Sequence, residues 1–327
     1  MTKTTICGWY GISRQAHAQM LKRRQRVTQQ EQKALAAVAV IRRQHPLMGA
    51  RKLLYKLANQ DIQIGRDRFF ALLRRMGLLV RRRRKGRRTT FPGGYRSENL
   101  LKNAKINQPD QAYVADITYL ETEQGFLYLA LVTDLYSRKI LGWDLSDSLA
   151  LAGASRAMQQ AISQADKSLS GLIHHSDHGV QYTSRSYLAL LARHGIRSSM
   201  GQVGNAYDNA VAERVNGILK LEYLLDQRFV DADVARRAVA EAIRLYNTDR
   251  PHLSLDYQTP EQVYRQSSSA VDDQAAIAER PAEAPGSSRV GETDLLQPWT
   301  KPSFRRQSAE AAWLTPSFSL DNVHFKT

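Results

Sequence analysis

The sequence is poor in cysteine, since Cys7 is the only one among 327 residues. A lone cysteine forms no internal disulfide and builds no Cys-rich zinc site, which excludes disulfide-stabilised and zinc-finger scaffolds. Long apolar runs are missing too, because none approaches the ~20 residues that cross a membrane. The opening stretch MTKTTICGWYGISRQ lacks the apolar centre of a signal peptide. We therefore expect a soluble protein of a reducing cytoplasm.

Acidic residues are scarce relative to basic ones. Lys and Arg number 47 against 31 Asp and Glu, which gives a net charge of +16. An excess of this size favours a polyanionic partner, because neutralising phosphates releases condensed counterions. A basic surface that only keeps the protein soluble is the alternative, and a total does not exclude it. The length corresponds to about two domains, and the 43% of hydrophobic residues suffice for a core.

The first eighty residues show helical patterns. The spacing predicts a short helix, a turn at Gly11, a helix capped by Ser13, and a capping box at Thr28–Glu31 that opens a further helix. Two helices follow around a polar turn that contains Gly65, an arrangement typical of a helix-turn-helix. Their apolar faces consist of Leu53, Leu54 and Leu57, then of Phe69 or Phe70 with Leu73 and Met76. Candidate DNA contacts of the second helix are Arg66, Arg68, Arg74 and Arg75. An ordinary helical hairpin with solvated arginines fits the pattern equally well.

A dense basic run separates these helices from the rest of the chain. Its cationic members are Arg81, Arg82, Arg83, Arg84, Lys85, Arg87 and Arg88. Like charges at this density repel each other and resist folding, which predicts a linker or arm. We favour an arm that lies along a DNA backbone over a plain linker.

The pattern changes to strands from Ala112. Three β-branched and aromatic runs (AYVADITYL, GFLYLALVTDLYS and KILGWDL) precede alternating helices and strands, among them the strands GLIHHSD and IRSSM. This order predicts an α/β domain with a mixed five-stranded sheet and flanking helices, preceded by an all-α region. Thr259, Pro260 and Gln262 predict one more capped helix start. Beyond Arg265 the chain loses its pattern, and we expect it to be mostly disordered.

Three carboxylates occupy positions that a fold rarely gives to acids. Asp116 interrupts an apolar strand, Asp177 ends another strand, and Glu213 lies on a long helix with Lys220 two turns later on the same side. Taken singly, each acid fits a salt bridge or a solvated face. Together they can converge at one edge of a sheet, where three hard oxygen donors suit Mg²⁺ or Mn²⁺. Two such ions can activate a nucleophile and stabilise the leaving oxygen of a phosphodiester.

These residues carry a resemblance to a known family. Between Asp177 and Glu213 lie 213 − 177 − 1 = 35 residues, which resembles the DD(35)E signature of retroviral-integrase-like transposases. The stretches ADITYL, LVTDLYSRKILGW, HSDHGVQYTS, GNAYDNAVAE and LKLEY are similar to the OrfB protein of IS3-family insertion sequences, and HPLMGARKLLYKL is similar to that family's helix-turn-helix. The resemblance covers about residues 45–265.

The resemblance implies an RNase H-like integrase core with Asp116, Asp177 and Glu213 as catalytic and metal-binding residues, and Lys220 as a DNA contact. It implies Mg²⁺ or Mn²⁺, two ions per site, and metal-dependent DNA cleavage and strand transfer by a DDE transposase. The implied partners are double-stranded DNA (terminal repeats and target), further copies of the chain on DNA, and an upstream-frame OrfA or fused OrfAB product. The implied location is the bacterial cytoplasm, at the nucleoid. His175, Asp134, Gln181, Asn205, Asp208 and Asn209 occupy motif positions, and we expect them to support the site rather than ligate.

Five regions are expected along the chain. They are an N-terminal helical, helix-turn-helix-like segment (1–44), a helix-turn-helix DNA-binding domain (45–80), a basic arm (81–110), the integrase core (111–265) and the tail (266–327). Two other functions remain open, a DNA-binding regulator with an inactive nuclease-like core and a hydrolytic nuclease of the same fold. The intact acid triad argues against the regulator, and the additional DNA-binding segments argue against the nuclease.

Overall fold

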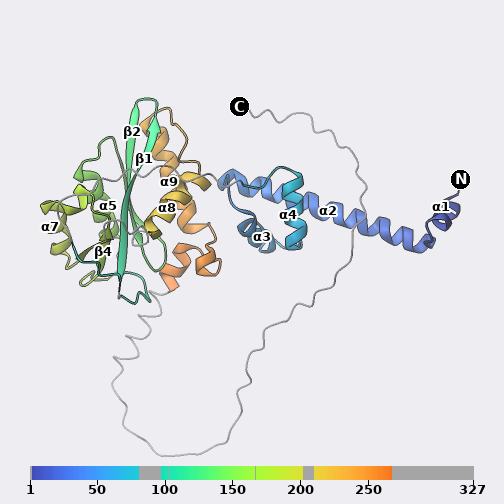
Figure 1. Ribbon diagram of the computed structural model, residues 1–327, viewed down its shortest axis with the longest axis horizontal. Helices are drawn as coiled ribbons and strands as arrows, with labels where there is room; N and C mark the ends of the chain where they lie inside the picture. Colours follow the sequence, from blue (N-terminus) through green and yellow to red (C-terminus); the bar gives the residue numbers. More distant parts are fainter. Residues whose placement is uncertain (1, 81–96, 103, 166, 202–209, 267–327) are drawn as a thin grey trace, which may run out of the picture. The chain divides into compact units, whose positions relative to one another are not determined.

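The computed structural model in Figure 1 describes residues 2–80, 97–102, 104–165, 167–201 and 210–266. The chain divides into two units, Met1–Glu279 and Arg280–Thr327, and all described residues belong to the first. The candidate DNA contacts Arg81 to Arg88 and the motif residues Asn205, Asp208 and Asn209 lie outside the described residues. So does the tail after residue 266. No described helix combines the length and the apolarity that a membrane crossing requires.

Four helices form the N-terminal region: α1 (Lys3–Trp9), α2 (Arg14–Gln44), α3 (Ala50–Ala58) and α4 (Arg66–Arg75). Ser13 caps α2 as predicted, since its hydroxyl accepts a hydrogen bond from the Ala16 N–H at 3.0 Å. The second half of α2 packs with α3 and α4 around a shared apolar core. Its buried members are Ala34, Val38, Ile41, Met48, Leu53, Leu57, Phe69, Leu72 and Leu73.

Two details of the helical prediction are wrong. No helix begins at Thr28, because α2 runs through this position without a break. The Thr28 hydroxyl donates to the carbonyl of Arg24 inside the helix, and the Glu31 carboxylate binds arginines of α4 instead of folding back as a cap. Met76 is 41% exposed, since it follows the end of α4 and Leu72 occupies the apolar face in its place.

The predicted mixed five-stranded sheet is confirmed. Its strands are β1 (Ala112–Thr122), β2 (Gly125–Asp134), β3 (Ile140–Ser146), β4 (Ile173–Ser176) and β5 (Arg197–Met200), in the order β3-β2-β1-β4-β5. The first three strands are antiparallel neighbours, whereas β4 runs parallel to both β1 and β5. The parallel pairing of β1 with β4 is short, from Ala112 to Val114. The remainder of β1 therefore continues past the end of β4.

Helices cover both faces of this sheet (Figure 1). On one side lie α5 (Leu151–Ser163), α6 (Val180–Thr183) and α7 (Arg185–Arg193), and on the other lie α8 (Ala210–Glu222), α9 (Ala232–Thr248) and the 3₁₀ turn Leu253–Leu255. Gly142 lets α5 approach β3 closely, because a Cβ atom at this position would lie 1.9 Å from the Ala157 carbonyl oxygen. The predicted capping box is present: Thr259 and Gln262 exchange two hydrogen bonds where residues 260–266 become helical.

A buried polar network joins residues 45–56 to the ends of α8 and α9. Glu222 accepts hydrogen bonds from Lys52 at 2.6 Å and from Arg250 at 2.9 Å. Asp249 binds Lys56 and His45, each at 2.5 Å. Lys52, Arg250 and His45 are all at most 5% exposed. These residues therefore connect the last turn of α8, the helix that also carries Glu213, to α3.

Candidate active site at the open edge of the sheet

Asp116 lies on β1 just beyond the point where β4 stops pairing with it. Its carboxylate accepts a hydrogen bond from the Asn216 side-chain amide of α8 at 2.7 Å. A second bond comes from the Ile117 backbone N–H at 2.9 Å. Alternation along the strand places Asp116 on the face that α8 covers, the face on which Leu120 also packs. The sheet and α8 thus fix both oxygens of this carboxylate.

Asp177 directly follows the last residue of β4 and is half-buried. One of its oxygens accepts the Gly179 N–H at 3.0 Å, which closes a tight turn into α6. A Cβ atom at Gly179 would lie 2.9 Å from that oxygen, so glycine lets the backbone approach the carboxylate. Because β4 is parallel to β1, its carboxyl end brings Asp177 to the part of β1 where Asp116 lies.

Glu213 is exposed in the first turn of α8, three residues before Asn216. Val215 and Ile218 of this helix are buried, whereas Val211 is only partly buried. Asn216 itself is 7% exposed because it reaches in to Asp116. Sequence reasoning gave Asn216 no role, although its spacing of three residues from Glu213 on a helix was a signal that could have found it.

The pKa of Asp116 depends on its burial and on the two other acids. Burial raises the pKa of Asp116 to about 7, and the negative charges of Asp177 and Glu213 act in the same direction. The hydrogen bonds from Asn216 and Ile117 oppose this rise only in part. Within the described residues, no group of three or more His, Cys, Asp and Glu side chains has the spacing of an assembled metal centre. Asp177 and Glu213 thus lie within electrostatic range of Asp116, although the three acids do not form an assembled metal-binding group.

Lys220 lies two turns after Glu213 on α8, as the sequence predicts. Its ammonium group sits 4.3 Å above the ring of Tyr119 on β1. Burial lowers the pKa of Lys220, while the charges of Asp226 and Asp116 counteract this. The ammonium group of Lys220 is therefore held beside β1, within electrostatic range of Asp116.

The motif residues expected to support the site are engaged in hydrogen bonds. His175 pairs with Ser199 at 2.9 Å, and its neighbour His174 pairs with Tyr187 at 2.9 Å. Asp134 accepts bonds from the Ser137 N–H and hydroxyl, both at 2.6 Å. The Gln181 amide donates to the Leu149 carbonyl at 2.9 Å. His175 and Gln181 thus lie in or after β4, next to Asp177, whereas Asp134 pairs with Tyr113 near the start of β1.

The four candidate arginines of the helix pair differ in their surroundings. Arg68 and Arg75 both bind Glu31 of α2, at 3.0 and 2.7 Å. Arg66 pairs with its neighbour Asp67 at 2.9 Å and stays 74% exposed. Arg74 is exposed as well. Two of the four therefore also fasten α4 to α2, a role that the sequence pattern did not reveal.

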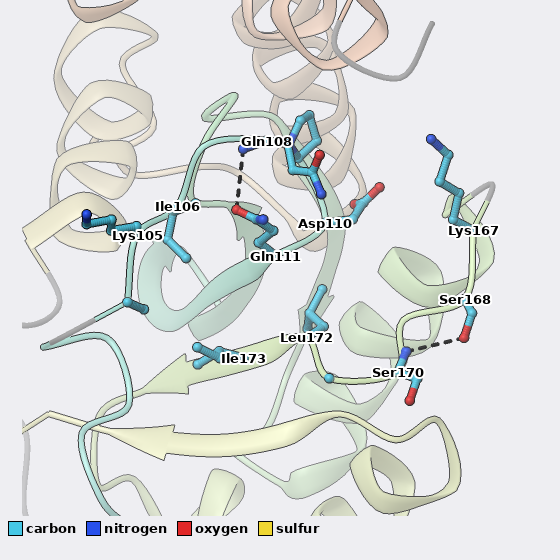
Figure 2. Close-up of a pocket in the computed structure, with 13 residues that line it drawn as sticks. Lys105, Ile106, Gln108, Asp110, Gln111, Lys167, Ser168, Ser170, Leu172 and Ile173 are labelled. Carbon is cyan, nitrogen blue, oxygen red and sulfur yellow. Dashed lines mark hydrogen bonds between the residues drawn. The ribbon is translucent and has the colours of Figure 1, made fainter. Parts of the chain in front are cut away.

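A cavity of about 440 Å³ lies at the other end of β1 and β4 (Figure 2). Its walls come from residues 104–111 and 167–173, including Lys105, Gln111 and Leu172. These segments precede the two strands, whereas Asp116 and Asp177 lie at or after the ends of their pairing. The cavity is therefore separate from the acidic site.

Two family models, both described as "Integrase core domain", match residues 106–206 and 194–260. Among relatives, the "Insertion element IS600 uncharacterized 31 kDa protein" of Shigella sonnei is 33% identical over 262 residues, which cover 78% of this chain and 96% of that protein. "Transposase InsF for insertion sequence IS3A" of Escherichia coli (strain K12) is 36% identical over 233 residues, 69% of this chain and 79% of that protein. The chain belongs to the IS3 family of insertion-sequence transposases.

Other similarities of this IS3-family chain cover less of the molecule. The "Putative transposase for insertion sequence element IS986/IS6110" of Mycobacterium tuberculosis (strain CDC 1551 / Oshkosh) is 39% identical over 183 residues, which span 54% of this chain and 66% of that protein. Among solved structures, the HTLV-2 integrase catalytic core domain in complex with magnesium is 21% identical, with a TM-score of 0.38, and the match covers 48% of this chain and 97% of that one. The family assignment rests on the sequence matches.

The donor set of this IS3-family site fits a divalent metal ion. All three acids offer carboxylate oxygens, the ligands that hard cations such as Mg²⁺ prefer. Burial and, after it, the charges of Asp177 and Glu213 disfavour the ionised form of Asp116 and raise its pKa, and a bound cation would favour the carboxylate.

Proposed function

We propose that the chain is a DDE transposase that binds insertion-sequence ends and catalyses metal-dependent DNA cleavage and strand transfer. The observation that carries the proposal is the placement of Asp116 on β1 where pairing with β4 ends, with Asp177 directly after β4 and both Asp177 and Glu213 within electrostatic range of Asp116. A binding protein has no physical reason to keep three repelling carboxylates together, because they weaken both folding and the attraction of DNA.

Asp116, Asp177 and Glu213 are the proposed catalytic residues and would hold Mg²⁺ or Mn²⁺, with two ions per site. When bound, such ions activate the attacking hydroxyl and stabilise the leaving oxygen of the phosphodiester. Asn216 orients the Asp116 carboxylate through its hydrogen bond. The turn at Gly179 orients Asp177. Two of the three acids are thus held in place by hydrogen bonds from neighbouring elements.

The DNA contacts form a second part of the proposal. Lys220 is positioned to neutralise a phosphate near the cut, because it lies beside β1 on the helix that carries Glu213. The candidate contacts of the helix pair and arm are Arg66, Arg68, Arg74, Arg75 and the basic residues from Arg81 to Arg88. Arg66 and Arg74 are the most available of the described ones, since they are exposed and do not bind Glu31.

Partners and organisation follow from the reaction. The substrates would be double-stranded terminal repeats and target DNA in the bacterial cytoplasm, at the nucleoid. Holding two ends together requires at least two copies of the chain, and an upstream-frame OrfA or fused OrfAB product is a further partner. The division into segment 1–44, helix-turn-helix 45–80, arm 81–110, core 111–265 and tail 266–327 is part of the same proposal.

A joining assay tests this function. Purified full-length chain is incubated with a labelled element end and Mg²⁺ or Mn²⁺, and products are separated by length. Asp116→Ala, Asp177→Ala and Glu213→Ala should each abolish joining and leave binding of the end largely intact. Binding without chemistry by the unaltered chain, even after addition of the fused OrfAB product, would instead favour a DNA-binding regulator with an inactive core.

A further inference from the structure

The edge of β1 is open over a short stretch beside Asp116. Pairing with β4 ends at Val114. The edge is covered again only at Glu121 to Glu123, whose backbone groups exchange hydrogen bonds with Phe229 at 2.8 and 2.9 Å. Among the described residues, no strand pairs with β1 on this side between those two points. A length of strand edge is therefore accessible between the acidic site and Phe229.

Two large aromatic side chains stand at this part of the sheet. Tyr119 of β1 and Phe126 of β2 are 47% and 54% exposed. Tyr119 is paired in register with Tyr128, so Phe126 is its diagonal neighbour across the strands. The two rings meet edge to face, with centroids 5.4 Å apart and an interplanar angle of 83°. The two rings hold each other in place, and much of their surface remains exposed to solvent. Exposure of apolar area is unfavourable by about 25 cal/mol per Å².

Cations flank the aromatic pair. Lys220 lies over the Tyr119 ring at 4.3 Å, and its side chain comes from α8, on the face of the sheet that carries Asp116. Tyr119 belongs to the opposite face by strand alternation, so Lys220 reaches it around the open edge. Near the other end of this stretch of β1, the Arg228 side chain is 60% exposed. Its Nε atom lies 3.8 Å from the Glu121 carboxylate and 3.5 Å from the Thr122 carbonyl oxygen. We call Tyr119, Phe126, Lys220 and Arg228 the basic-aromatic strip.

The strip lies within a few nucleotides of the proposed reaction centre. Asp116 and Tyr119 are three residues apart on one strand, which corresponds to about 10 Å at the usual rise. Successive base pairs of B-DNA are about 3.4 Å apart, so this distance spans roughly three of them. Aromatic rings beside cations are the surface on which proteins stack unpaired bases while tracking the phosphate backbone.

We propose that the basic-aromatic strip binds an unpaired base at the end of the DNA, with Phe126 and Tyr119 as the stacking surface and Lys220 and Arg228 on the adjoining phosphates. This inference rests on the proposed function, since it takes the DNA end as the ligand. It assigns Tyr119 a further role, because its ring holds Lys220 beside the edge of β1. The strip favours ends whose last base pairs are opened, since an unpaired base can leave the stack and turn toward the rings.

The test uses binding alone, so that it does not depend on chemistry. Full-length Asp177→Asn protein is titrated with Mg²⁺ present against two duplexes that carry the same element-end sequence, one fully paired and one with two mismatched terminal pairs. Each carries 2-aminopurine at its end, whose fluorescence falls when the base stacks. We expect tighter binding and quenching with the mismatched end. Phe126→Ala should weaken its binding by about 5- to 150-fold and remove the quenching.

Matched variants separate stacking from general effects. Tyr10→Ala removes an aromatic residue just after α1 that is 77% exposed, and it should change neither affinity nor quenching. Tyr119→Phe keeps the ring and should behave like the parent protein, whereas Tyr119→Ala should lose the quenching. Equal binding of both duplexes by the parent, or full quenching by Phe126→Ala, would overturn the inference while leaving the transposase function intact. Failure of the parent to bind either duplex would contradict the proposed function itself.

Discussion

The Glu222 network gives a prediction about stability that can be worked from its parts. Glu222 ends α8, where the helix dipole disfavours a carboxylate. Burial would raise its pKa, but the hydrogen bonds and charges of Arg250 and Lys52 lower it to about 2. A carboxyl group with this pKa when folded and 4.5 when unfolded contributes about 3 kcal/mol to the free energy of unfolding at neutral pH.

The two cations of the network are not equivalent. Burial lowers the pKa of Lys52 to about 8, and the charge of Arg250 adds to this despite the attraction of Glu222. The lowered pKa of Glu222 indicates that the fold favours its charged form, whereas the lowered pKa of Lys52 indicates that the fold disfavours its charged form. The two cationic partners of Glu222 outweigh its burial, whereas Lys52 has one anionic partner, which does not outweigh burial and the charge of Arg250. The carboxylate is therefore the member whose loss matters most.

Glu222→Gln should lower the free energy of unfolding by about 3–5 kcal/mol, because it leaves two buried cations without a counter-ion. Lys52→Met should cost about 1 kcal/mol or less, since the Arg250–Glu222 pair remains. Urea unfolding followed by circular dichroism at pH 7 measures both. The stability from Glu222 is present above pH 4.5 and is lost as the pH falls toward 2, so the difference between Glu222→Gln and the unaltered chain should shrink over that range.

Glu241→Gln is the matched control, because it breaks an ion pair with Arg244 in which both side chains are 54% exposed. Its unfolding midpoint should equal that of the unaltered chain. A loss for Lys52→Met as large as that for Glu222→Gln, or a Glu222→Gln difference that persists at pH 2, would refute the reasoning.

Three further predictions concern the fold, the site and the DNA contacts. Gly142→Ala should destabilise the chain by several kcal/mol, since the new methyl group would lie 1.9 Å from the Ala157 carbonyl oxygen. The control Gly8→Ala meets nothing within 4 Å and should leave the stability unchanged. Thermal unfolding compares the two variants, and equal stabilities would contradict the close packing at Gly142. Asn216→Leu should shift the Mg²⁺ dependence of joining to higher Mg²⁺ concentration, because it removes a hydrogen bond that lowers the pKa of Asp116. An unchanged Mg²⁺ dependence would show that Asn216 has no role in the site. Arg66→Ala and Arg74→Ala should each weaken binding equally across DNA sequences and reduce the salt dependence of binding by about one phosphate contact. Binding titrations at several salt concentrations measure this, and an unchanged slope of affinity against salt concentration would exclude both arginines as phosphate contacts.

The fold was largely predictable from local patterns, and the failures have physical reasons. The β-branched runs and the turns between them predicted the five strands, and Ser13 and Thr259 marked real helix starts. The capping box at Thr28 failed because the same residues also suit a helix interior, where a threonine hydroxyl can bond to the carbonyl four residues earlier. A short motif cannot decide between these two uses.

The sequence selected the three acids of the candidate site but not the residues that surround them. Spacing and resemblance selected Asp116, Asp177 and Glu213, since each stands out against its own segment. Asn216 was missed because its role depends on α8 lying against β1, a contact across 100 residues of sequence. The pairing of Arg68 and Arg75 with Glu31 was missed for the same reason. Contacts between distant segments leave no mark on local spacing.

The most direct test of the transposase reaction is the joining of a labelled element end by the full-length chain with Mg²⁺, compared with Asp177→Asn and with Asp147→Asn. Asp147 is exposed just after β3, so the control makes the same chemical change away from the three acids. We predict joined products from the unaltered chain and from Asp147→Asn, and none from Asp177→Asn, which should still bind the end. Undiminished joining by Asp177→Asn would contradict the proposal.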